Sequence, residues 1–524
     1  MENIHNFLKP IDFIVVLIYL LILVGIGYYV SFVKKKKSGE NLFLAGHSLG
    51  WTSIGFTMWG TNVGPSMLIA SASIGYTTGV VAGNFGWYAF VFILLLALVF
   101  APRYLHAKVQ TLPEFMGKRF GETTRSYLAW YTMATILLSW LALTLFAGGI
   151  LVSQILDLPL WTSVVILVLI AAFFTVAGGL KAVAYTNVFQ MSLLIIVSLI
   201  LTLVGLHKAG GVMNVYENTP ANYWNLFLPI DNKDYPWIAI ILGYPVMGVW
   251  FWCTDQSMVQ SVLGAKNLRQ GQFGANFTGW LKIFDVALFI IPGITCLVLF
   301  PGLSDPDEAY MTMVTRLLPA GMTGLVMAVL IAALVSTIDS ALNSLSTVFT
   351  MDVYIKKYNP EASEKVIIMT GRIVTVIGAV IAIFLTLAID RIKGLNLFDV
   401  FQSVLGFIAP PMSVVFLFGV LWKKTTTRAA NVILSAGTII SLGTGLLFFI
   451  TKEKWDWPHF LLVSFYIFIL LSLMAFLVSW FDRKADTGTG LDFSNLPGTG
   501  RGVKISWILL IIIMVSLYII FNGH

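Results

Sequence analysis

Long runs of apolar residues, separated by short polar segments, make up most of this chain of 524 residues. Most runs have at least the roughly 20 residues that an α-helix needs to cross the hydrocarbon core of a bilayer. The runs span approximately 10–33, 48–78, 79–102, 124–155, 160–178, 182–207, 237–263, 274–301, 323–355, 364–389, 396–422, 428–451, 459–481 and 504–522. This pattern predicts an all-α polytopic membrane protein with about 14 transmembrane helices.

Composition agrees with this fold class. Apolar residues make up 58% of the chain and charged residues only 11%, which is not the balance of a soluble protein. The net charge of +7 does not indicate a nucleic-acid surface, because the basic residues lie in short loops rather than in one patch. Both cysteines, Cys253 and Cys296, lie inside apolar runs, which argues against a disulfide or a metal site.

The basic loops predict how the chain lies across the membrane. Lysine and arginine cluster in every second loop, as at 34–37 and 356–357, and such loops are usually cytoplasmic. The basic loops are 34–47, 103–123, 264–273, 356–363, 423–427 and 482–503. Both termini, with the loops 208–236 and 302–322, are therefore expected on the outer side of a cell membrane.

One apolar run contains a cluster of polar side chains. In AALVSTIDSALNS (332–344), helical spacing places Ser336, Asp339, Ser340 and Asn343 on one face. An ionisable residue at the centre of a membrane helix costs about 2.5–3.5 kcal/mol, so Asp339 should face a partner or a wet cavity. Hydroxyl and carboxylate oxygens suit a hard cation. We expect a cation site here, although small polar residues also join membrane helices.

Two runs are interrupted by glycine and proline at a similar depth. They carry the sequences GTNVGPS (60–66) and LGYPVMG (242–248). Pro65 has no N–H for the carbonyl four residues earlier, so oxygens near Thr61 stay free. A matching pair of broken helices in two halves of a chain indicates an inverted-repeat transporter whose site lies at mid-membrane depth.

Six stretches of the chain resemble a known family. They are NLFLAGHSLGW (41–51), TLPEFMGKRF (111–120), AGGLKAVAYTNVFQ (177–190), WCTDQSMVQSVLGAKN (252–267), FTMDVY (349–354) and FLFGVLWKKTT (416–426). In this order they resemble the sodium/solute symporter family, with the sodium/sugar cotransporters as the most similar members.

The resemblance implies a five-plus-five inverted-repeat core whose first helix in each repeat is broken. The whole chain, 1–524, is then one transmembrane transporter domain. Residues 10–33 form an extra N-terminal helix, 48–207 the first repeat, 237–422 the second repeat and 428–522 three C-terminal helices.

The resemblance also implies a sodium site, with Na⁺ as the cofactor. The implied ligands are backbone oxygens of the first broken helix and oxygens of the run 323–355. They fall on Gly60, Val63, Ala333, Ser336 and Thr337.

Some family members have a second sodium site, whose aspartate aligns with Asn187. Here a carboxylate stands instead at Asp339, so Asp339, Ser340, Ser336 and Asn187 are predicted to hold a second ion. The alternative is a single-ion transporter in which Asp339 pairs with Asn187 or an internal water.

The solute pocket matches the family less well. Positions that hold sugar hydroxyls in relatives align with Met67, Gly86, Ala89 and Gly248, none of which is polar here, and the aromatic gate is Phe251. Lys282 and Gln402 match their polar counterparts, although Asp285 one turn on could instead pair with Lys282. Further hydrogen bonds or a stacking face could come from Asn62, Asn84, Trp59 and Tyr88.

These features predict a sodium-coupled symporter that imports a small organic solute, foremost a sugar or related polyol, by alternating access. The alternatives are sodium- or proton-coupled uptake of a carboxylate or acidic sugar, or a non-transporting sensor or a channel on the same fold. An enzyme is not indicated, because all six histidines lie in loops or at the ends of the chain. The expected partners are the solute, sodium and the bilayer, without nucleic acid; the oligomeric state stays open.

Overall fold

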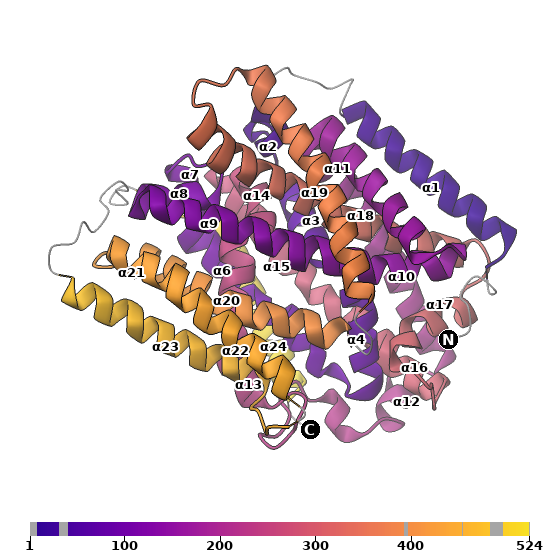
Figure 1. The fold of residues 1–524 in the computed structure, drawn as a ribbon. Helices are drawn as coiled ribbons and strands as arrows, with labels where there is room; N and C mark the ends of the chain where they lie inside the picture. The colour runs from indigo at the N-terminus through magenta and orange to yellow at the C-terminus, as the bar shows by residue number, and fades with distance from the viewer. Residues whose placement is uncertain (1–7, 31–39, 392–396, 453, 483–495, 523–524) are drawn as a thin grey trace.

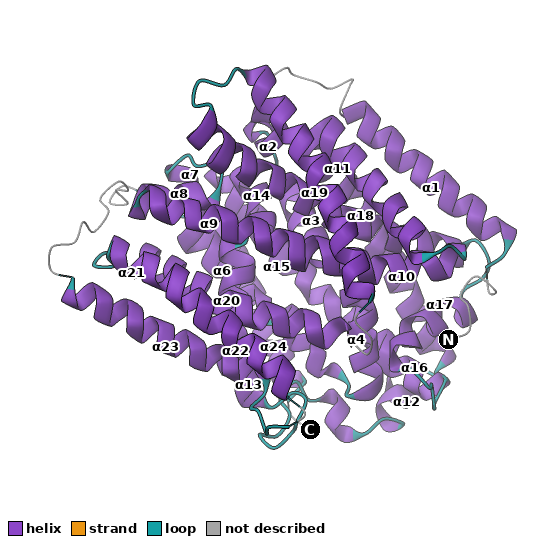
Figure 2. Cartoon of the chain, in the orientation of Figure 1, coloured by secondary structure: helices purple, strands orange, loops and turns teal. Residues whose placement is uncertain are grey.

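The structure, a computed structural model, describes residues 8–30, 40–391, 397–452, 454–482 and 496–522. Figure 2 shows helices joined by short loops, and no strand forms within these ranges. Twelve of the described helical segments are long and apolar enough to cross a membrane. The helical architecture predicted from the apolar runs is thus confirmed.

The twelve spans form one bundle (Figure 1), and shorter helices lie in several of the connections between them. They are Pro10–Tyr28 (α1), Val80–His106 (α5 to α7), Glu122–Leu156 (α9 and α10), Leu160–Lys208 (α11), Trp237–Thr254 (α13 and a π-helical turn), Leu268–Leu299 (α15 and α16), Met322–Tyr358 (α18 and a π-helical extension), Glu364–Asp390 (α19), Gln402–Leu421 (within α20, Leu397–Leu421), Thr427–Thr451 (α21 and α22), Phe460–Phe481 (α23) and Arg501–Ile520 (α24). Shorter helices are Glu40–Leu44 (α2), Trp51–Asn62 (α3), Pro65–Thr77 (α4), Leu112–Phe120 (α8), Val212–Glu217 (α12), Gln256–Leu263 (α14) and Ala309–Leu317 (α17).

The predicted runs and the observed spans differ at two places. Runs 160–178 and 182–207 join in the single helix α11, which is interrupted at Gly179 (φ 57°, ψ −157°). A Cβ at this glycine would lie 2.1 Å from the carbonyl oxygen of Leu42, so no other residue fits. Run 48–78 is divided into the two shorter helices α3 and α4.

The break between α3 and α4 lies where the sequence predicted it. α3 ends at Asn62 and α4 begins at Pro65, while Val63 (φ −88°, ψ 83°) and Gly64 (φ −94°, ψ 163°) leave helical geometry. Pro65 cannot donate to the carbonyl oxygen of Thr61, and the Gly64 N–H donates to Asn62 instead. Carbonyl oxygens at the end of α3 therefore lose their usual helical donors.

The second break lies elsewhere than predicted. α13 stays helical through LGYPVMG, with Pro245 inside it. The chain leaves helical geometry only at Asp255 (φ −81°, ψ 128°), whose Oδ1 accepts hydrogen bonds from the N–H groups of Ser257 and Met258 and so starts α14. The prediction was about two turns too early, because membrane helices tolerate proline where neighbouring groups satisfy the backbone.

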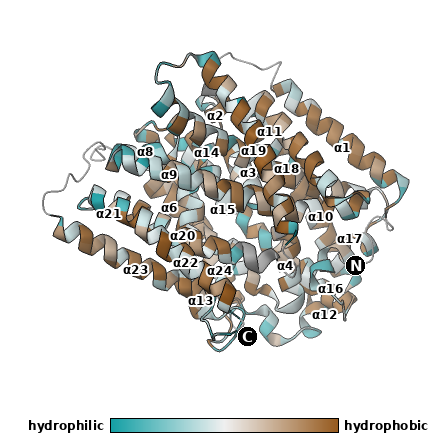
Figure 3. Cartoon of the chain, in the orientation of Figure 1, coloured by the Kyte–Doolittle hydropathy of each residue, from teal (hydrophilic) through white to brown (hydrophobic). Residues whose placement is uncertain are grey.

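Helix α18 lies at the centre of the bundle and packs against α1, α3, α10, α11 and α19. All its residues from 326 to 348 are buried. The peripheral helices differ: α1 and α23 expose leucines such as Leu17 and Leu473, and Figure 3 shows both coloured brown along most of their length. The polar residues of α18 thus face protein on every side.

The loops predicted to be cytoplasmic gather at one end of the bundle. Lys266 N–H donates to the carbonyl oxygen of Leu49, and Arg119 donates to that of Lys423 at 3.1 Å. Each contact joins two segments on or next to different basic loops, so these loops lie close together in pairs.

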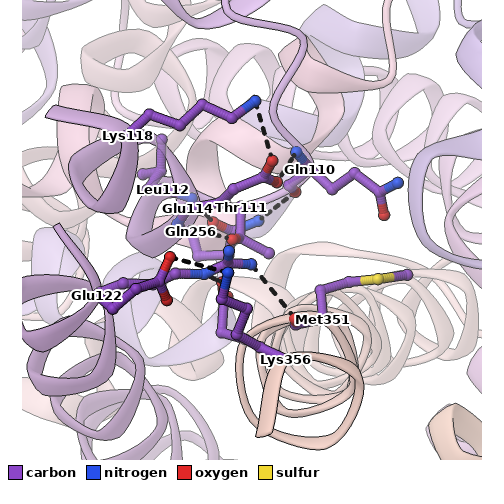
Figure 4. A network of polar contacts seen from close by, with 11 residues as sticks. Gln110, Thr111, Leu112, Glu114, Lys118, Glu122, Gln256, Met351 and Lys356 are labelled. Atoms are coloured by element: carbon purple, nitrogen blue, oxygen red, sulfur yellow. Dashed lines mark hydrogen bonds and ion pairs between the residues drawn. The ribbon is translucent and has the colours of Figure 1, made fainter. Parts of the chain in front are cut away.

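A polar network strengthens this end (Figure 4). Lys356, after the end of α18, pairs with Glu122 of α9 at 2.9 Å. The side-chain oxygen of Gln256 on α14 accepts the N–H of Leu112 on α8 at 2.8 Å. The network therefore links α8, α9, α14 and the end of α18.

The opposite end holds the loops 208–236 and 302–322 and both described ends of the chain. Tyr223 donates its hydroxyl to the carbonyl oxygen of Thr77 at 2.6 Å, and Leu226 N–H donates to that of Phe521 at 2.9 Å. The described ends of the chain thus lie at the end of the bundle that holds these two loops, and the side of the membrane that this end faces stays a prediction.

Asp12 of α1 ties the first helix to the start of α18 at this end. Its Oδ1 accepts hydrogen bonds from the N–H groups of Gly321 and Gly324, both at 2.7 Å, and the residue is only 1% exposed. The first turn of a helix cannot satisfy these N–H groups itself. A carboxylate there also interacts favourably with the helix dipole.

We expect Asp12→Ala to lower the free energy of unfolding by about 2 kcal/mol, because it removes two charge-assisted hydrogen bonds from a buried helix end. Thermal unfolding of the purified protein in detergent measures the change as a lower midpoint. Asp456→Ala, in an exposed loop before α23, is the control and should leave the midpoint unaltered. Equal midpoints for the Asp12 variant and the parent would contradict the capping role.

Candidate functional site

A cavity of about 380 Å³ connects the break between α3 and α4 with the loop 302–322. Its lining runs from Asn62 and Thr337, at the centre of the bundle, to Asp305 and Arg316 at the end that holds both termini. Small-molecule sites occupy about 300–1,000 Å³. The cavity therefore has the size and depth of a solute site.

Aromatic rings form the floor of the cavity. Phe251 and Trp252 follow the end of α13, and both line it. The centroid of the Phe251 ring lies 5.2 Å from that of Trp140 and 5.1 Å from that of Trp252. Trp140 Nε1 donates to Asp255 Oδ2 at 3.1 Å, so the floor is held to the start of α14.

Four residues predicted to bind solute line this cavity: Met67, Gly248, Phe251 and Gln402. Gln402 is the polar member of this group. A Cβ on Gly248 would lie 2.4 Å from the ring of Phe92, so glycine permits the close approach of α13 to α6. The predicted gate residue Phe251 and the amide of Gln402 thus line the same cavity, although they lie on helices far apart in the chain.

Lys282 lies behind the cavity wall and not in it. Its side chain is fully buried, and its Nζ donates to Asp285 Oδ2 at 2.6 Å and to Asn62 Oδ1. Trp59 Nε1 donates to the other Asp285 oxygen at 2.9 Å. The alternative noted from the sequence, a Lys282–Asp285 pair, is therefore present, as expected of charges in a dry interior.

The other predicted solute residues, on α5 and α6, are not among those that line this cavity. Asn84 Nδ2 donates to the carbonyl oxygen of Leu226 at 2.6 Å, and Ala89 is fully buried. A Cβ on Gly86 would lie 2.8 Å from Asp285 Oδ2. The space that a side chain at position 86 would enter therefore holds the carboxylate of Asp285.

Three further candidates have separate roles. Asn62 lines the cavity while its Oδ1 is held by Lys282, so its amide N–H₂ is the group free to face the cavity. Trp59 supports Asp285 from behind. Tyr88 stacks on Tyr244 with 5.5 Å between ring centroids, and Tyr244 lines the cavity.

The oxygens predicted for the first sodium ion lie around the break, which Val63 forms. A Cβ on Gly60 would be 3.2 Å from Ser336 Oγ, and Thr337 Oγ1 lies 3.3 Å from the carbonyl oxygens of both Thr61 and Ala333. Ser336 Oγ is buried without a hydrogen-bond partner among the described residues. A lone hydroxyl beside freed carbonyl oxygens fits a hard cation.

The residues predicted for a second ion begin one turn further along α18. Both carboxylate oxygens of Asp339 are buried and lack a well-formed hydrogen bond, although Ser340 is a polar neighbour. Ser340 Oγ accepts a hydrogen bond from Thr61 Oγ1 at 3.0 Å. The two sets of candidate ligands are therefore connected through one side chain at the break.

Asn187 reaches the same level from α11. The second half of α11 runs antiparallel to α18, since Gly205 lies against Met313, just before α18, while Met191 lies beside Ser336. Asn187 lies one turn before Met191, and Ser340 lies one turn after Ser336. Because the helices are antiparallel, this register places Asn187 at the level of Asp339 and Ser340. Both polar atoms of the Asn187 amide are buried and have no partner among the described residues.

The arrangement suits a monovalent cation better than a transition metal. Within the described ranges, no group of three or more His, Cys, Asp or Glu side chains could hold a metal ion. The available donors are carbonyl, hydroxyl, amide and single carboxylate oxygens, which hard cations prefer.

Sequence reasoning missed three parts of this region. Trp252 follows the gate residue directly, and Gln190, with both amide atoms unpartnered among the described residues, lies three positions after Asn187 on the same helix face. The charged mouth at Asp305 and Arg316 had no sequence signal, because only the fold brings that loop over the cavity.

One family model and several known proteins resemble this chain. The model of the "Sodium:solute symporter family" matches residues 42–437. The sodium/glucose cotransporter 4 of Danio rerio is 32% identical over 470 residues, which are 83% of this chain and 71% of that protein. The sodium/myo-inositol cotransporter 2 of Homo sapiens is 31% identical over 520 residues, which are 90% of this chain and 77% of that protein.

Solved structures share the fold. A Na⁺-coupled sialic acid symporter in a substrate-bound, outward-open state superposes with a TM-score of 0.79 at 18% identity, over 91% of this chain and 99% of its own. MhsT in complex with L-phenylalanine superposes with a TM-score of 0.51 at 14% identity, over 81% of this chain and 98% of its own. At such identities the likeness concerns the fold alone.

The Lys282–Asp285 pair gives a testable prediction. Lys282→Met and Asp285→Asn should each lower the free energy of unfolding by about 3–5 kcal/mol, because each leaves an uncompensated buried charge. The double variant should regain most of one loss, which a double-mutant cycle of thermal unfolding in detergent measures. The more exposed pair Lys118–Glu114, 3.1 Å apart, is the control and should show a coupling of about 0–1 kcal/mol. Strict additivity for Lys282 and Asp285 would refute the pairing.

Proposed function

This chain belongs to the sodium:solute symporter family, and on that premise we propose that it imports a neutral sugar or polyol. It is a sodium-coupled symporter and a multi-pass membrane protein, and it is not an enzyme. Sodium and a small solute are its transported substrates. Sodium is thus a co-substrate and not the cofactor that the sequence analysis named.

The charge of the cavity carries the proposal of a neutral solute. Its charged lining residues are Asp305, Asp307, Glu308 and Arg316, all at the mouth, and the described deep lining is uncharged. The nearest deep cation, Lys282, is neutralised by Asp285. A carboxylate solute would lose its hydration here without gaining a counter-charge.

The deep lining offers what a sugar or polyol needs. Asn62 and Gln402 supply amide groups, while Phe251 and Trp252 supply flat apolar faces. Hydroxyl groups pair with the first set and C–H faces with the second. The printed names of the relatives, glucose and myo-inositol cotransporters, agree with this class.

The architecture belongs to the same proposal. Counting both halves of α11 and the broken pair α3 and α4, the chain has fourteen membrane-crossing segments in one domain, 1–524. Residues 48–207 and 237–422 form the two inverted repeats, broken at 63–64 and at Asp255. Segment 10–33 precedes this five-plus-five core, and 428–522 adds three helices.

We also assign the sides of the membrane. The end with the basic loops faces the cytoplasm, so both termini and the mouth of the cavity face outward across the cell membrane. Solute then enters from outside past Asp305 and Arg316 and stops at the floor formed by Phe251 and Trp140.

The first sodium ion sits at the break, held by oxygens of Gly60, Val63, Ala333, Ser336 and Thr337. Thr337 also lines the solute cavity, so the ion fixes the shape of the break that forms the pocket, and the two substrates bind cooperatively. A potential of about 100 mV contributes about 2.3 kcal/mol per ion, and a tenfold sodium gradient about 1.4 kcal/mol. One ion could sustain a solute gradient of about 500-fold.

A second sodium ion is held by Asp339 with Ser340, Ser336 and Asn187. The support is that the carboxylate of Asp339 and the amide of Asn187 are both buried without a well-formed hydrogen bond among the described residues, on the packed helices α18 and α11. A buried charge without a counter-charge is costly, and a bound cation supplies one.

Uptake by proteoliposomes tests the solute class. With an inward sodium gradient, we expect accumulation of a hexose or inositol and none of sialic acid or short carboxylates. Collapse of the sodium gradient with an ionophore should abolish accumulation. Uptake of an acidic solute in preference to neutral ones would overturn the proposed class, and uptake driven by protons alone would overturn the ion sites.

The first ion site is tested by Thr337→Ala. Loss of one ligand should raise the half-saturating sodium concentration about tenfold, measured as solute uptake against external sodium. Thr375→Ala is the control, because this buried threonine bonds to Gly371 within α19. An unchanged sodium dependence in Thr337→Ala would exclude its hydroxyl as a ligand.

The second ion site is tested by stoichiometry. Reversal potentials, or paired ²²Na⁺ and solute fluxes, should give two sodium ions per solute in the parent and one in Asp339→Asn. A parent ratio of one would remove the second site while leaving the first intact.

A further inference from the structure

A stripe of polar side chains runs along α18 and into its π-helical extension, from the candidate sodium site toward the end with the basic loops. At 100° per residue its members fall within an arc of about 120°. This inner polar stripe consists of Ser336, Ser340, Asn343, Ser344, Thr347 and Thr350. All six residues are buried.

Most of the stripe is unpaired. Ser336 Oγ, Asn343 Nδ2, Ser344 Oγ and Thr350 Oγ1 are buried with no hydrogen-bond partner in the part of the chain that the structure describes. Each such group costs about 1–3 kcal/mol, and native proteins retain few of them. A row of four on one helix face therefore requires a physical explanation.

Ser340 and Thr347 bond to neighbouring helices, but within the described ranges the four unpaired members of the stripe do not join helices in this way. Buried serines that join helices in this protein bond to carbonyl oxygens: Ser346 donates to Gly371 at 2.7 Å and Ser413 to Val246 at 2.6 Å. Ser346 is two residues from Ser344, on another face of α18. Both residues are buried serines, but only Ser346 has a hydrogen-bond partner among the described residues.

Helix α14 continues the stripe toward the basic-loop end. Gln260 Nε2 donates to Thr347 Oγ1 at 2.6 Å, and Gln256 Nε2 donates to Gln260 Oε1 at 2.9 Å. The other side of Gln256 accepts the N–H of Leu112 in the network of Figure 4. Polar groups thus extend from the break in α3 to the surface network without an intervening apolar layer on α18.

We propose that the inner polar stripe and the facing side of α14 form the route by which sodium leaves toward the basic-loop side. In the present conformation the route is closed, because its polar atoms are buried. When α14 moves away from α18, water enters and satisfies these atoms, so their cost is relieved in the inward-facing state. The inference rests on the proposed first sodium site, where the stripe begins.

The chemistry of the route selects a small cation. Its side chains are hydroxyls and amides, which replace the hydration oxygens of a monovalent ion at little charge cost. The solute cavity reaches the neighbours of the stripe at Thr61 and Thr337, but no stripe residue and no residue of α14 is among its described lining, which includes Phe251 and Trp140. Ion and solute would therefore leave by different surfaces of α14 and α18.

Thiol accessibility tests the route. The chain has only two cysteines, so Cys253→Ala and Cys296→Ala give a cysteine-free parent. Into it Ser344→Cys is introduced, with Ser346→Cys as the matched control. Silver ion, a thiol-reactive monovalent cation, is added in chloride-free buffer to sided membrane vesicles from either side.

We expect silver applied from the basic-loop side during sodium-driven turnover to abolish uptake by Ser344→Cys and to leave Ser346→Cys and the parent active. Silver applied to the same side with sodium absent should act more slowly. Protection of Ser344→Cys under every condition, or reaction only from the opposite side, would overturn the route. If the native chain itself shows no sodium-driven uptake, the proposed function fails instead.

A second variant does not depend on a reagent. Ser344→Ala should slow net uptake into sodium-free vesicles about tenfold, with the half-saturating external sodium concentration unchanged. Solute exchange at equal high sodium on both sides should stay at the parental rate, because it needs no sodium release. Ser346→Ala should instead lower thermal stability and keep the parental rates. Parental net uptake by Ser344→Ala would contradict the proposal.

Discussion

The break between α3 and α4 depends on a rule of the membrane interior: a backbone oxygen that loses its helical donor must find another partner inside the protein. Val63 and Gly64 are not helical, so carbonyl oxygens at the end of α3 lack their usual helical donors. The hydroxyl of Thr337 on α18 donates a hydrogen bond to one of them, the carbonyl oxygen of Thr61. Helices α3, α11 and α18 pack against one another around this point.

The proposed ion site and the candidate solute site meet at this one place. Thr61 contacts Ser340 and Thr337, while the next residue, Asn62, lines the solute cavity. A change in backbone shape at the break therefore alters both sites together. If both proposed sites are correct, this proximity gives a physical basis for coupling, because each substrate would bind best to the same conformation of a two-residue segment.

The buried charged residues behind the cavity and the buried Asp339 of α18 have different surroundings. Behind the cavity, Lys282 and Asp285 neutralise one another, and Trp59 and Asn62 satisfy the remaining groups. Near α11, Asp339 has no such partner among the described residues. The first arrangement stabilises the fold and orients Asn62; the second leaves two buried carboxylate oxygens without a described partner near the break, where a bound cation would supply one.

The sequence by itself determined the helical membrane architecture, the break at 62–65, the polar face of 332–344 and the grouping of the basic loops. These features follow from local rules of apolar length, proline chemistry and helical period, which hold whatever the neighbours are. Family resemblance added the candidate ligands Gly60, Ser336 and Thr337. Such information is contained in short stretches of chain.

Only the tertiary structure decided the second break, the partner of Lys282 and the lining of the cavity. Pro245 stays inside a helix and Asp255 begins the next one, because side-chain hydrogen bonds there outweigh a local proline signal. Asn84 and Gly86 pack away from the cavity, whereas Arg316 reaches its mouth from a distant loop. Each outcome depends on which helices touch, and pairings between distant segments are not encoded in the period or composition of either one.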